Sequence, residues 1–178
     1  MTPQNCRFFE QMQLLTNILR QSPSAVAKIQ GSERYPDIRG EVTFHQTSAG
    51  VLVSTQVAGL PTSDGDCAGR VFSFHIHGGG ACTGNSTDPF ADALTHYDPY
   101  GCEHPLHAGD LPPLFGNHGY AFSVCLTDRF SVSEIIGKTV IVHADADDFT
   151  SQPSGKAGEK IACGEIKKIG SLLSCYSR

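Results

Sequence analysis

The sequence predicts an all-β protein, an antiparallel β-barrel or sandwich with long loops and an added N-terminal helix. Two observations carry this prediction. Beyond Pro23, six segments place apolar residues at every second position, the pattern of a half-buried strand. The 19 Gly and 10 Pro are spread along the chain without a repeat, which favours many turns over a helical bundle. At 178 residues the chain is long enough for one well-buried core and short for two.

The first segment is expected to be a helix. Thr2 and Pro3 suit its start, and Pro23 lies at its end. Between them, apolar residues recur at spacings of four, three and four, which puts one face together: Phe8, Met12, Leu15 and Leu19. This face either packs against the same chain, the simpler interpretation, or serves as a dimer contact or regulatory arm. The chain therefore divides into an N-terminal helical extension, a β-domain and a C-terminal tail: residues 1–23, 24–170 and 171–178.

The strands follow in order. Alternating segments bounded by turn residues are expected at 41–46, 51–57, 71–77, 120–127, 138–143 and 161–169. A short helical turn is expected over residues 131–136. Between the strands lie two long irregular regions, about 78–117 and 144–160. Loops of that length in a compact domain usually carry function, so we expect the site there.

Composition narrows the function. The formal net charge of −5 argues against nucleic acid as a partner, because phosphate binding relies on clustered Lys and Arg. No apolar run approaches the roughly 20 residues that span a bilayer, so no membrane partner is expected. The first residues lack the basic and apolar regions of a secretory signal. The protein is therefore expected to be cytoplasmic if Met1 is the native start, and extracytoplasmic if the chain is a mature form.

Ligand-type side chains gather in one polar segment, residues 95–110. It holds three histidines and an aspartate at short spacing: His96, His104, His107 and Asp110. A single histidine is more often a surface ring or a hydrogen-bonded core ring. Four imidazole and carboxylate groups on one loop instead suit a borderline metal such as zinc. A metal site is therefore predicted before any resemblance is considered.

Three further histidines lie on predicted strands. The strand period puts His75 and His77 on the same face of one strand, opposite its phenylalanines and isoleucine. His143 ends an apolar run, and a strand end is where a rigid scaffold presents a side chain to a site. A pair of solvated surface histidines is the alternative for His75 and His77, because His-x-His alone is a weak motif.

Taken in order, these elements resemble the copper,zinc superoxide dismutases over most of residues 25–170. The matching segments are 75-HIH-77, 96-HYDP-99, 104-HPLHAGD-110, 143-HADADD-148 and 162-ACG-164. The resemblance implies a Greek-key β-barrel and one copper and one zinc per chain. It also implies an oxidoreductase whose small-molecule substrate is superoxide, converted to oxygen and hydrogen peroxide by copper redox cycling. A homodimer is compatible with it.

The resemblance also assigns the site residue by residue. Copper would be held by His75, His77, His96 and His143, and zinc by His96, His104, His107 and Asp110. His96 would bridge the two metals and carry a proton when it leaves copper. Asp147 matches a carboxylate that links a copper ligand to a zinc ligand, whereas a solvated loop aspartate describes its neighbours better. Cys82 and Cys163 match a disulfide that would contribute roughly 4 kcal/mol in the loop-entropy model.

Departures from the family pattern keep two functions open. The position of an arginine above copper is occupied by Lys160, which the resemblance places in catalysis together with His96. Only Pro-Leu separates His104 from His107, the loop 82–96 is longer than usual, and the loop 144–160 is shorter. The first function is a superoxide dismutase. The second is a catalytically weak copper- and zinc-binding module, metallochaperone-like or structural. The complete set of ligand positions favours the first.

Overall fold

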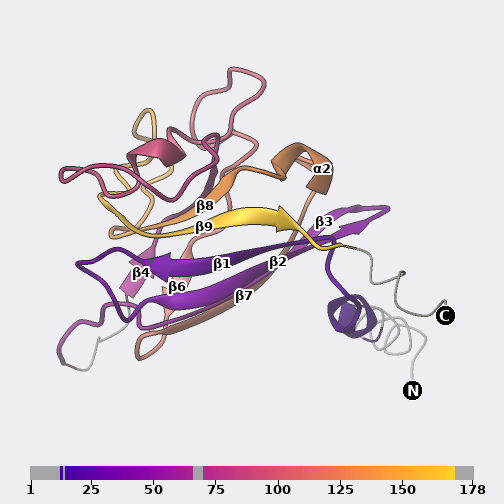
Figure 1. Ribbon diagram of the computed structural model, residues 1–178, viewed down its shortest axis with the longest axis horizontal. Helices are drawn as coiled ribbons and strands as arrows, with labels where there is room; N and C mark the ends of the chain where they lie inside the picture. The colour runs from indigo at the N-terminus through magenta and orange to yellow at the C-terminus, as the bar shows by residue number, and fades with distance from the viewer. Residues whose placement is uncertain (1–12, 14, 66–69, 171–178) are drawn as a thin grey trace, which may run out of the picture.

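The computed structural model describes residues 13, 15–65 and 70–170. Most strands form one curled antiparallel sheet with the order β5-β8-β9-β1-β2-β3-β7 (Figure 1). Their bounds are β1 Ala25–Gly31, β2 Arg39–Thr47, β3 Gly50–Ala58, β5 Phe74–His77, β7 Tyr120–Thr127, β8 Thr139–His143 and β9 Lys160–Lys168. A second small sheet pairs β4, Arg70–Phe72, with β6, Leu114–Gly116. The all-β prediction is confirmed.

The chain crosses the sheet between β7 and β8. These strands are consecutive in sequence, but β7 is the last strand of the sheet and β8 lies near its other edge, next to β5. The crossing contains the short helix α2, Val132–Ile135, where a helical turn was predicted. The backbone N–H of Ser131 donates to the Glu134 carboxylate at 2.6 Å, which satisfies a donor at the start of this helix. Such a crossing connection is the Greek-key feature of the fold.

The predicted strand 71–77 is wrong in one respect, because it breaks into β4 and β5 at Ser73. Both the backbone N–H and the hydroxyl of Ser73 donate to the carbonyl oxygen of Asp145, at 2.9 and 2.7 Å. This contact takes the place of a strand-to-strand hydrogen bond at Ser73, so β4 and β5 join different sheets. The sequence pattern also missed β1 and β6. The first begins with three small or apolar residues in a row, Ala25, Val26 and Ala27, and the second has only three residues.

The core fills the inside of the curled sheet. Its largest fully buried side chains come from most of the strands and from the segments beside them, and include Phe44, Phe72, Phe74, Ile29, Ile76, Leu114 and Ile161. The sheet needs a glycine where β9 pairs with β1. A Cβ on Gly164 would lie 2.7 Å from both the Lys28 carbonyl oxygen and Ile29 Cδ1. Gly164 therefore permits the close approach that puts the last strand against the first.

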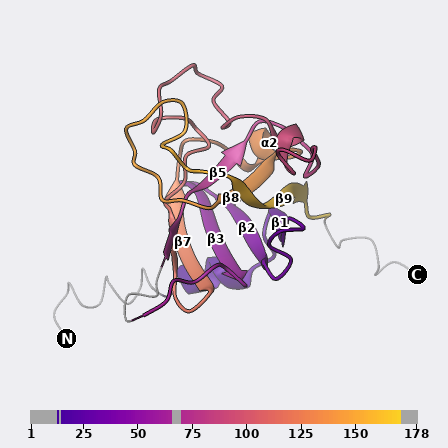
Figure 2. The ribbon, with the colours of Figure 1, turned by 90° about the vertical axis from the view of Figure 1, so that its left-hand side faces the viewer.

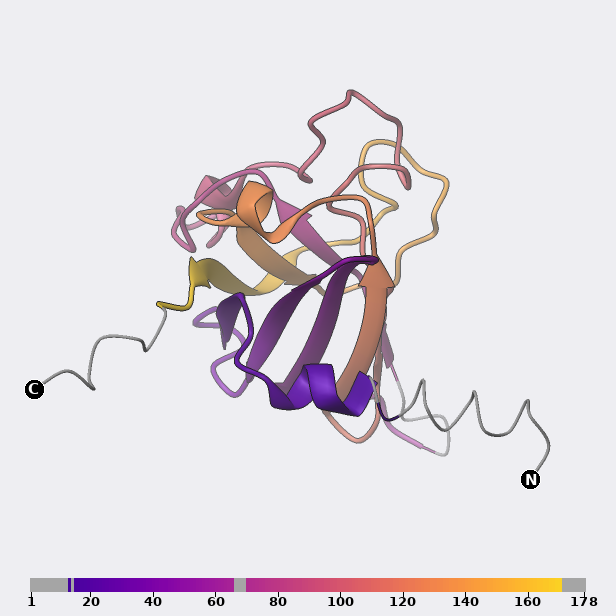
Figure 3. The same ribbon diagram turned by 90° about the vertical axis from the view of Figure 1, so that its right-hand side faces the viewer.

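The N-terminal helix is described only in part. Residues 13 and 15–20 are helical, and the segment lies outside the sheet (Figure 3). Leu19 lines a hollow with Val26, Thr43 and His45 on the outer face of β1 and β2, which agrees with packing on the same chain. The predicted positions of Phe8 and Met12, the helix start and the tail 171–178 lie outside the described residues, so the division into three parts stays a prediction. Within the described part, no helix is long and apolar enough to cross a membrane.

Two long loops gather on one side of the sheet. Figures 1 and 2 show the segments 78–113 and 144–159 together beyond β5 and β8. The first contains the one-turn helix η1, Ala91–Ala93. The predicted irregular region 78–117 is therefore correct up to residue 113, where β6 follows. The two loops enclose the ends of the strands that carry three of the predicted ligands.

Candidate metal centre

Two groups of buried ligand-type side chains meet at β5. His75, His77, His96 and His143 form the first group, and His96, His104, His107 and Asp110 form the second. Within each group the candidate ligand atoms all lie within 4.8 Å of one another, and His96 belongs to both. Backbone pairing brings the long loop to the strand: Tyr97 N–H donates to Ile76 O, and Ile76 N–H donates to Gly109 O, each at 2.8 Å.

Two histidines of the first group face each other with lone pairs. His77 Nδ1 lies 2.8 Å from the Leu94 carbonyl oxygen, and His143 Nδ1 lies 3.3 Å from that of Gly158. A carbonyl only accepts, so each Nδ1 carries the ring proton and each neutral ring has a lone pair on Nε2. The two Nε2 atoms are only 3.2 Å apart. Such a pair repels unless a cation lies beside it, and hydrogen bonding of the second ring nitrogen to a carbonyl is typical of metal-bound histidine.

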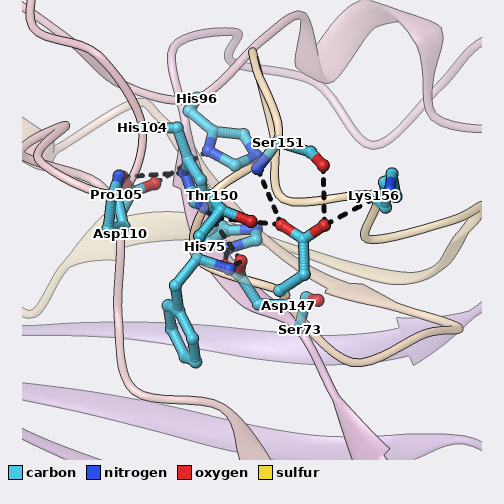
Figure 4. A network of polar contacts seen from close by, with 12 residues as sticks. Ser73, His75, His96, His104, Pro105, Asp110, Asp147, Thr150, Ser151 and Lys156 are labelled. Atoms are coloured by element: carbon cyan, nitrogen blue, oxygen red, sulfur yellow. Dashed lines mark hydrogen bonds and ion pairs between the residues drawn. The ribbon is translucent and has the colours of Figure 1, made fainter.

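Asp147 connects the two groups. Its Oδ2 accepts from His75 Nε2 at 3.0 Å and its Oδ1 from His104 Nε2 at 2.9 Å (Figure 4). These bonds leave the Nδ1 lone pair of each ring turned away from the carboxylate. Gly155, with φ +66°, makes the arrangement possible, because a Cβ there would lie 1.9 Å from Asp147 Oδ1. The carboxylate therefore fixes the orientation of one ring in each group.

His96 lies between the groups. Its Nδ1 donates to Asp110 Oδ1 at 2.8 Å, while its Nε2 is buried without a hydrogen-bond partner among the described residues. His75 Nδ1 and His104 Nδ1 are also buried without one, although His104 Nδ1 lies 3.1 Å from Asp110 Oδ2 in poor hydrogen-bond geometry. His107 Nδ1 lies 3.4 Å from His96 Nδ1. Buried lone pairs without hydrogen-bond donors are costly, and bound metal ions would satisfy them. The first group, with four nitrogen donors, fits copper, and the second, with three nitrogens and one carboxylate, fits zinc.

Burial keeps three rings of the first group neutral: His75, His77 and His143. Loss of hydration lowers the pKa of His75 from 6.5 to about 2, with His96 and His143 adding repulsion. Loss of hydration likewise lowers the pKa of His77 well below 6.5 and that of His143 to about 4. Burial acts to raise the pKa of Asp110, but the hydrogen bond and charge of His96 outweigh it and lower this pKa. Without metal, His75, His77 and His143 are thus neutral and Asp110 is ionised, the protonation states that metal binding requires.

The metal-free protein is expected to lose stability in mild acid. The unfolded chain binds protons at histidine below about pH 6.5 while the buried rings do not, so the free energy of unfolding falls as the pH drops. For His143 alone, a pKa lowered from 6.5 to about 4 corresponds to about 3 kcal/mol at the acid end. Urea unfolding of metal-free protein at pH 7, 6, 5 and 4 measures this slope. His143→Gln should flatten it, and an equal slope in this variant would contradict the assignment.

The predicted active-site lysine lies at the mouth of the same site. Lys160 lines a pocket of about 550 Å³ together with His77, His96 and His143. Its ammonium does not stand free in the pocket, because Nζ donates to Asp88 Oδ2 at 2.6 Å and to the Phe90 carbonyl oxygen at 3.1 Å. The cation predicted from the sequence is therefore present in the pocket, but it is paired with a carboxylate that the sequence did not indicate.

Three supporting residues were not predicted. Arg129 donates to the carbonyl oxygens of Pro105, His107 and Asp110 at 3.2–3.3 Å, which holds the short turn of the second group. Gln152 and His104 exchange two hydrogen bonds: His104 N–H to Gln152 Oε1 at 2.9 Å, and Gln152 Nε2 to His104 O at 2.7 Å. The third residue is Asp88. No local pattern could have found them, because their partners lie 19 to 72 residues away.

The cysteines of the loop and the last strand are joined. Cys82 and Cys163 form a disulfide with an Sγ–Sγ distance of 1.99 Å, across 81 residues of sequence. The bond packs with Phe90 and Ile141 in a small apolar cluster, which ties the loop 82–96 to β8 and β9. Within the described ranges, Cys102 is a free, exposed thiol and belongs to neither ligand group.

Comparisons with known proteins agree with this geometry. A family model described as copper/zinc superoxide dismutase (SODC) matches residues 38–166. The Cu-Zn superoxide dismutase 2 of Aquifex aeolicus (strain VF5) is 30% identical over 146 residues, covering 74% of this chain and 80% of that protein. The Cu-Zn superoxide dismutase of Legionella pneumophila is 33% identical over 136 residues, covering 72% of this chain and 77% of that protein.

A solved structure supports the fold independently. The Cu/Zn superoxide dismutase from Brucella abortus superposes with a TM-score of 0.68 and 24% sequence identity, covering 80% of this chain and 99% of that chain. This likeness concerns the barrel, whereas the family model and the curated relatives concern the sequence. On these grounds the chain belongs to the copper/zinc superoxide dismutase family.

Proposed function

We propose that this chain is an active superoxide dismutase that holds copper and zinc at the two ligand groups. Copper would be bound by His75, His77, His96 and His143, and zinc by His96, His104, His107 and Asp110. The observation that carries the proposal is the orientation of the buried rings. In four of the rings, His75, His77, His104 and His143, one nitrogen is held by a backbone carbonyl or by Asp147, which leaves the other nitrogen free for a metal.

Each group has its own task in the proposed reaction. Copper, when bound, supplies the one-electron chemistry that oxidises one superoxide and reduces another. The protein keeps the three rings of β5 and β8 neutral, oriented and shielded from water, since all three are buried. His96 offers two different nitrogens. Its Nδ1 is directed at Asp110, and its Nε2 has no hydrogen-bond partner in the part of the chain that the structure describes, so Nε2 is the atom that can hold and release a proton.

A metal-loading experiment tests the proposal. Purified protein is loaded with one equivalent each of copper and zinc, and its dismutase rate is compared with that of the same copper on an unrelated protein. Electron spin resonance should show tetragonal copper(II) with nitrogen ligands. A rate no higher than that of the unrelated protein would favour the second function, a copper- and zinc-binding module without efficient catalysis. The observation that favours this second function is the pairing of Lys160 with Asp88, because a paired ammonium attracts an anion less strongly.

Lys160 is expected to guide the substrate. Superoxide is an anion, and a cation at the pocket mouth attracts it through a field that salt screens. Lys160→Glu should lower the rate about tenfold at low ionic strength and weaken its salt dependence. Lys160→Arg should keep or raise the rate, because guanidinium retains the charge and adds a planar donor fork. Lys156→Glu is the matched control, since this lysine is exposed and pairs with Asp148. An unchanged rate and salt dependence in Lys160→Glu would remove Lys160 from guidance.

A further inference from the structure

The pocket mouth carries more acid than base. Among the described residues that line the pocket, Lys160 is the one lysine or arginine, whereas Asp88, Asp98 and Glu159 contribute carboxylates. Two of these acids are engaged elsewhere. The Glu159 carboxylate accepts from the Tyr35 hydroxyl and from Arg34, and Asp98 Oδ1 accepts from the backbone N–H of Tyr100. Asp88 is therefore the acid that acts on the pocket lysine.

The contact between Asp88 and Lys160 is built into the loop. Asp88 uses one oxygen, Oδ1, to accept the backbone N–H of Phe90 at 3.0 Å, and the other, Oδ2, to accept Lys160 Nζ at 2.6 Å. The Phe90 carbonyl oxygen takes a second proton of the ammonium at 3.1 Å. Since the Phe90 ring is buried against the Cys82–Cys163 disulfide, both acceptors are fixed. Two of the three N–H donors of the ammonium are thus occupied.

The position of the lysine gives this contact a consequence at the metal site. Lys160 opens β9 and is paired in register with His143 at the end of β8. Its side chain is 14% exposed, so little water competes with the carboxylate for the ammonium. The charge of a lysine lies at the end of a flexible side chain, so the group that binds the ammonium determines where the charge lies. While the ammonium is held on the loop, the negative charge of Asp88 largely cancels its attraction for an anion that enters the pocket.

We propose that Asp88 is a positioning residue that holds the Lys160 ammonium on the loop 82–96 and so limits the attraction of the copper pocket for small anions. This inference rests on the proposed copper site. Asp88→Asn is the informative change, because an asparagine Oδ1 can still accept the Phe90 N–H and keep the turn while the negative charge is lost. Asp92→Asn is the matched control. It makes the same charge change in the same loop, where the Asp92 carboxylate bonds to the Thr83 hydroxyl outside the pocket.

The first readout is the affinity of copper(II) for azide. Visible spectroscopy monitors this binding at several salt concentrations. Asp88→Asn should tighten azide binding about threefold to tenfold, with a steeper salt dependence, because the freed ammonium can approach the anion. Asp92→Asn should bind azide like the wild type. In a Lys160→Met background, Asp88→Asn should give less than half of this gain. An unchanged azide constant in Asp88→Asn, or an equal gain in the Lys160→Met background, would overturn the proposal.

The second readout needs no metal. Acetylation of individual lysines in the metal-free protein, followed by peptide mass spectrometry, reports whether Lys160 is held. Asp88→Asn should raise the labelling rate of Lys160 at least about threefold relative to Lys156, and Asp92→Asn should not. An unchanged rate would overturn the anchoring. If azide gave no copper band even in the wild type, the copper site itself would be wrong, and labelling would still decide whether Asp88 holds Lys160.

Discussion

Replacing His75 and His77 together by alanine is expected to abolish copper binding at the first ligand group and the dismutase activity with it. The change removes two of four nitrogen donors, His75 Nδ1 and His77 Nε2, from one rigid strand. Even the loss of a residue that only orients a metal ligand costs 10- to 100-fold in affinity. Loss of two ligands should therefore lower the copper affinity by more than about a hundredfold, and the rate after dialysis should fall to that of the metal-free protein.

The measurement is copper content after dialysis, together with the spin-resonance spectrum and the dismutase rate. His118→Asn is the matched control, since this exposed histidine lies in the turn before β7, outside both groups. Asparagine tolerates its positive φ of 50°. Circular dichroism verifies that the double variant retains its sheet. Full copper loading with an unaltered spectrum in the double variant would mean that the two histidines are not copper ligands.

Zinc is expected to raise the thermal stability of the metal-free protein strongly. A ligand that binds only the folded state stabilises it by mass action, by about 2.7 kcal/mol at a hundredfold excess over the dissociation constant. For a chain of this size that corresponds to a melting temperature higher by roughly 5–11 °C. The second ligand group is suited to this effect. Asp110 already accepts both His96 Nδ1–H and the backbone N–H of His107, so the loop is arranged before metal arrives.

His107→Ala or Asp110→Asn should lose most of this gain. The first change removes an imidazole and the second the negative charge, while copper binding at the first group should persist in weaker form because His96 is shared. Calorimetric melting with and without zinc measures the difference. Asp98→Asn, a carboxylate on the same loop outside the group, should respond to zinc like the wild type. A melting temperature that zinc does not move in the wild type would contradict a preformed zinc site.

Much of the fold could be read from alternation along the chain. Strands β2, β3, β7, β8 and β9 were predicted within two residues at each end, because apolar residues bounded by turn residues mark each of them, even β8, which is buried on both faces. The break at Ser73 could not be predicted. It depends on a carbonyl of Asp145, which lies 72 residues further along the chain. Strand β6 likewise exists only through its pairing with β4.

The ligand groups could be predicted from the amino-acid sequence. The spacing of His96, His104, His107 and Asp110 predicts a metal site, and the family resemblance adds His75, His77 and His143. How the cation at the pocket mouth is presented depends instead on tertiary contacts. Asp88 and Lys160 are 72 residues apart and of ordinary surface types, so neither spacing nor composition marks them. They meet because the disulfide and the buried Phe90 ring press the loop 82–96 against β9, and packing of this kind has no local signature.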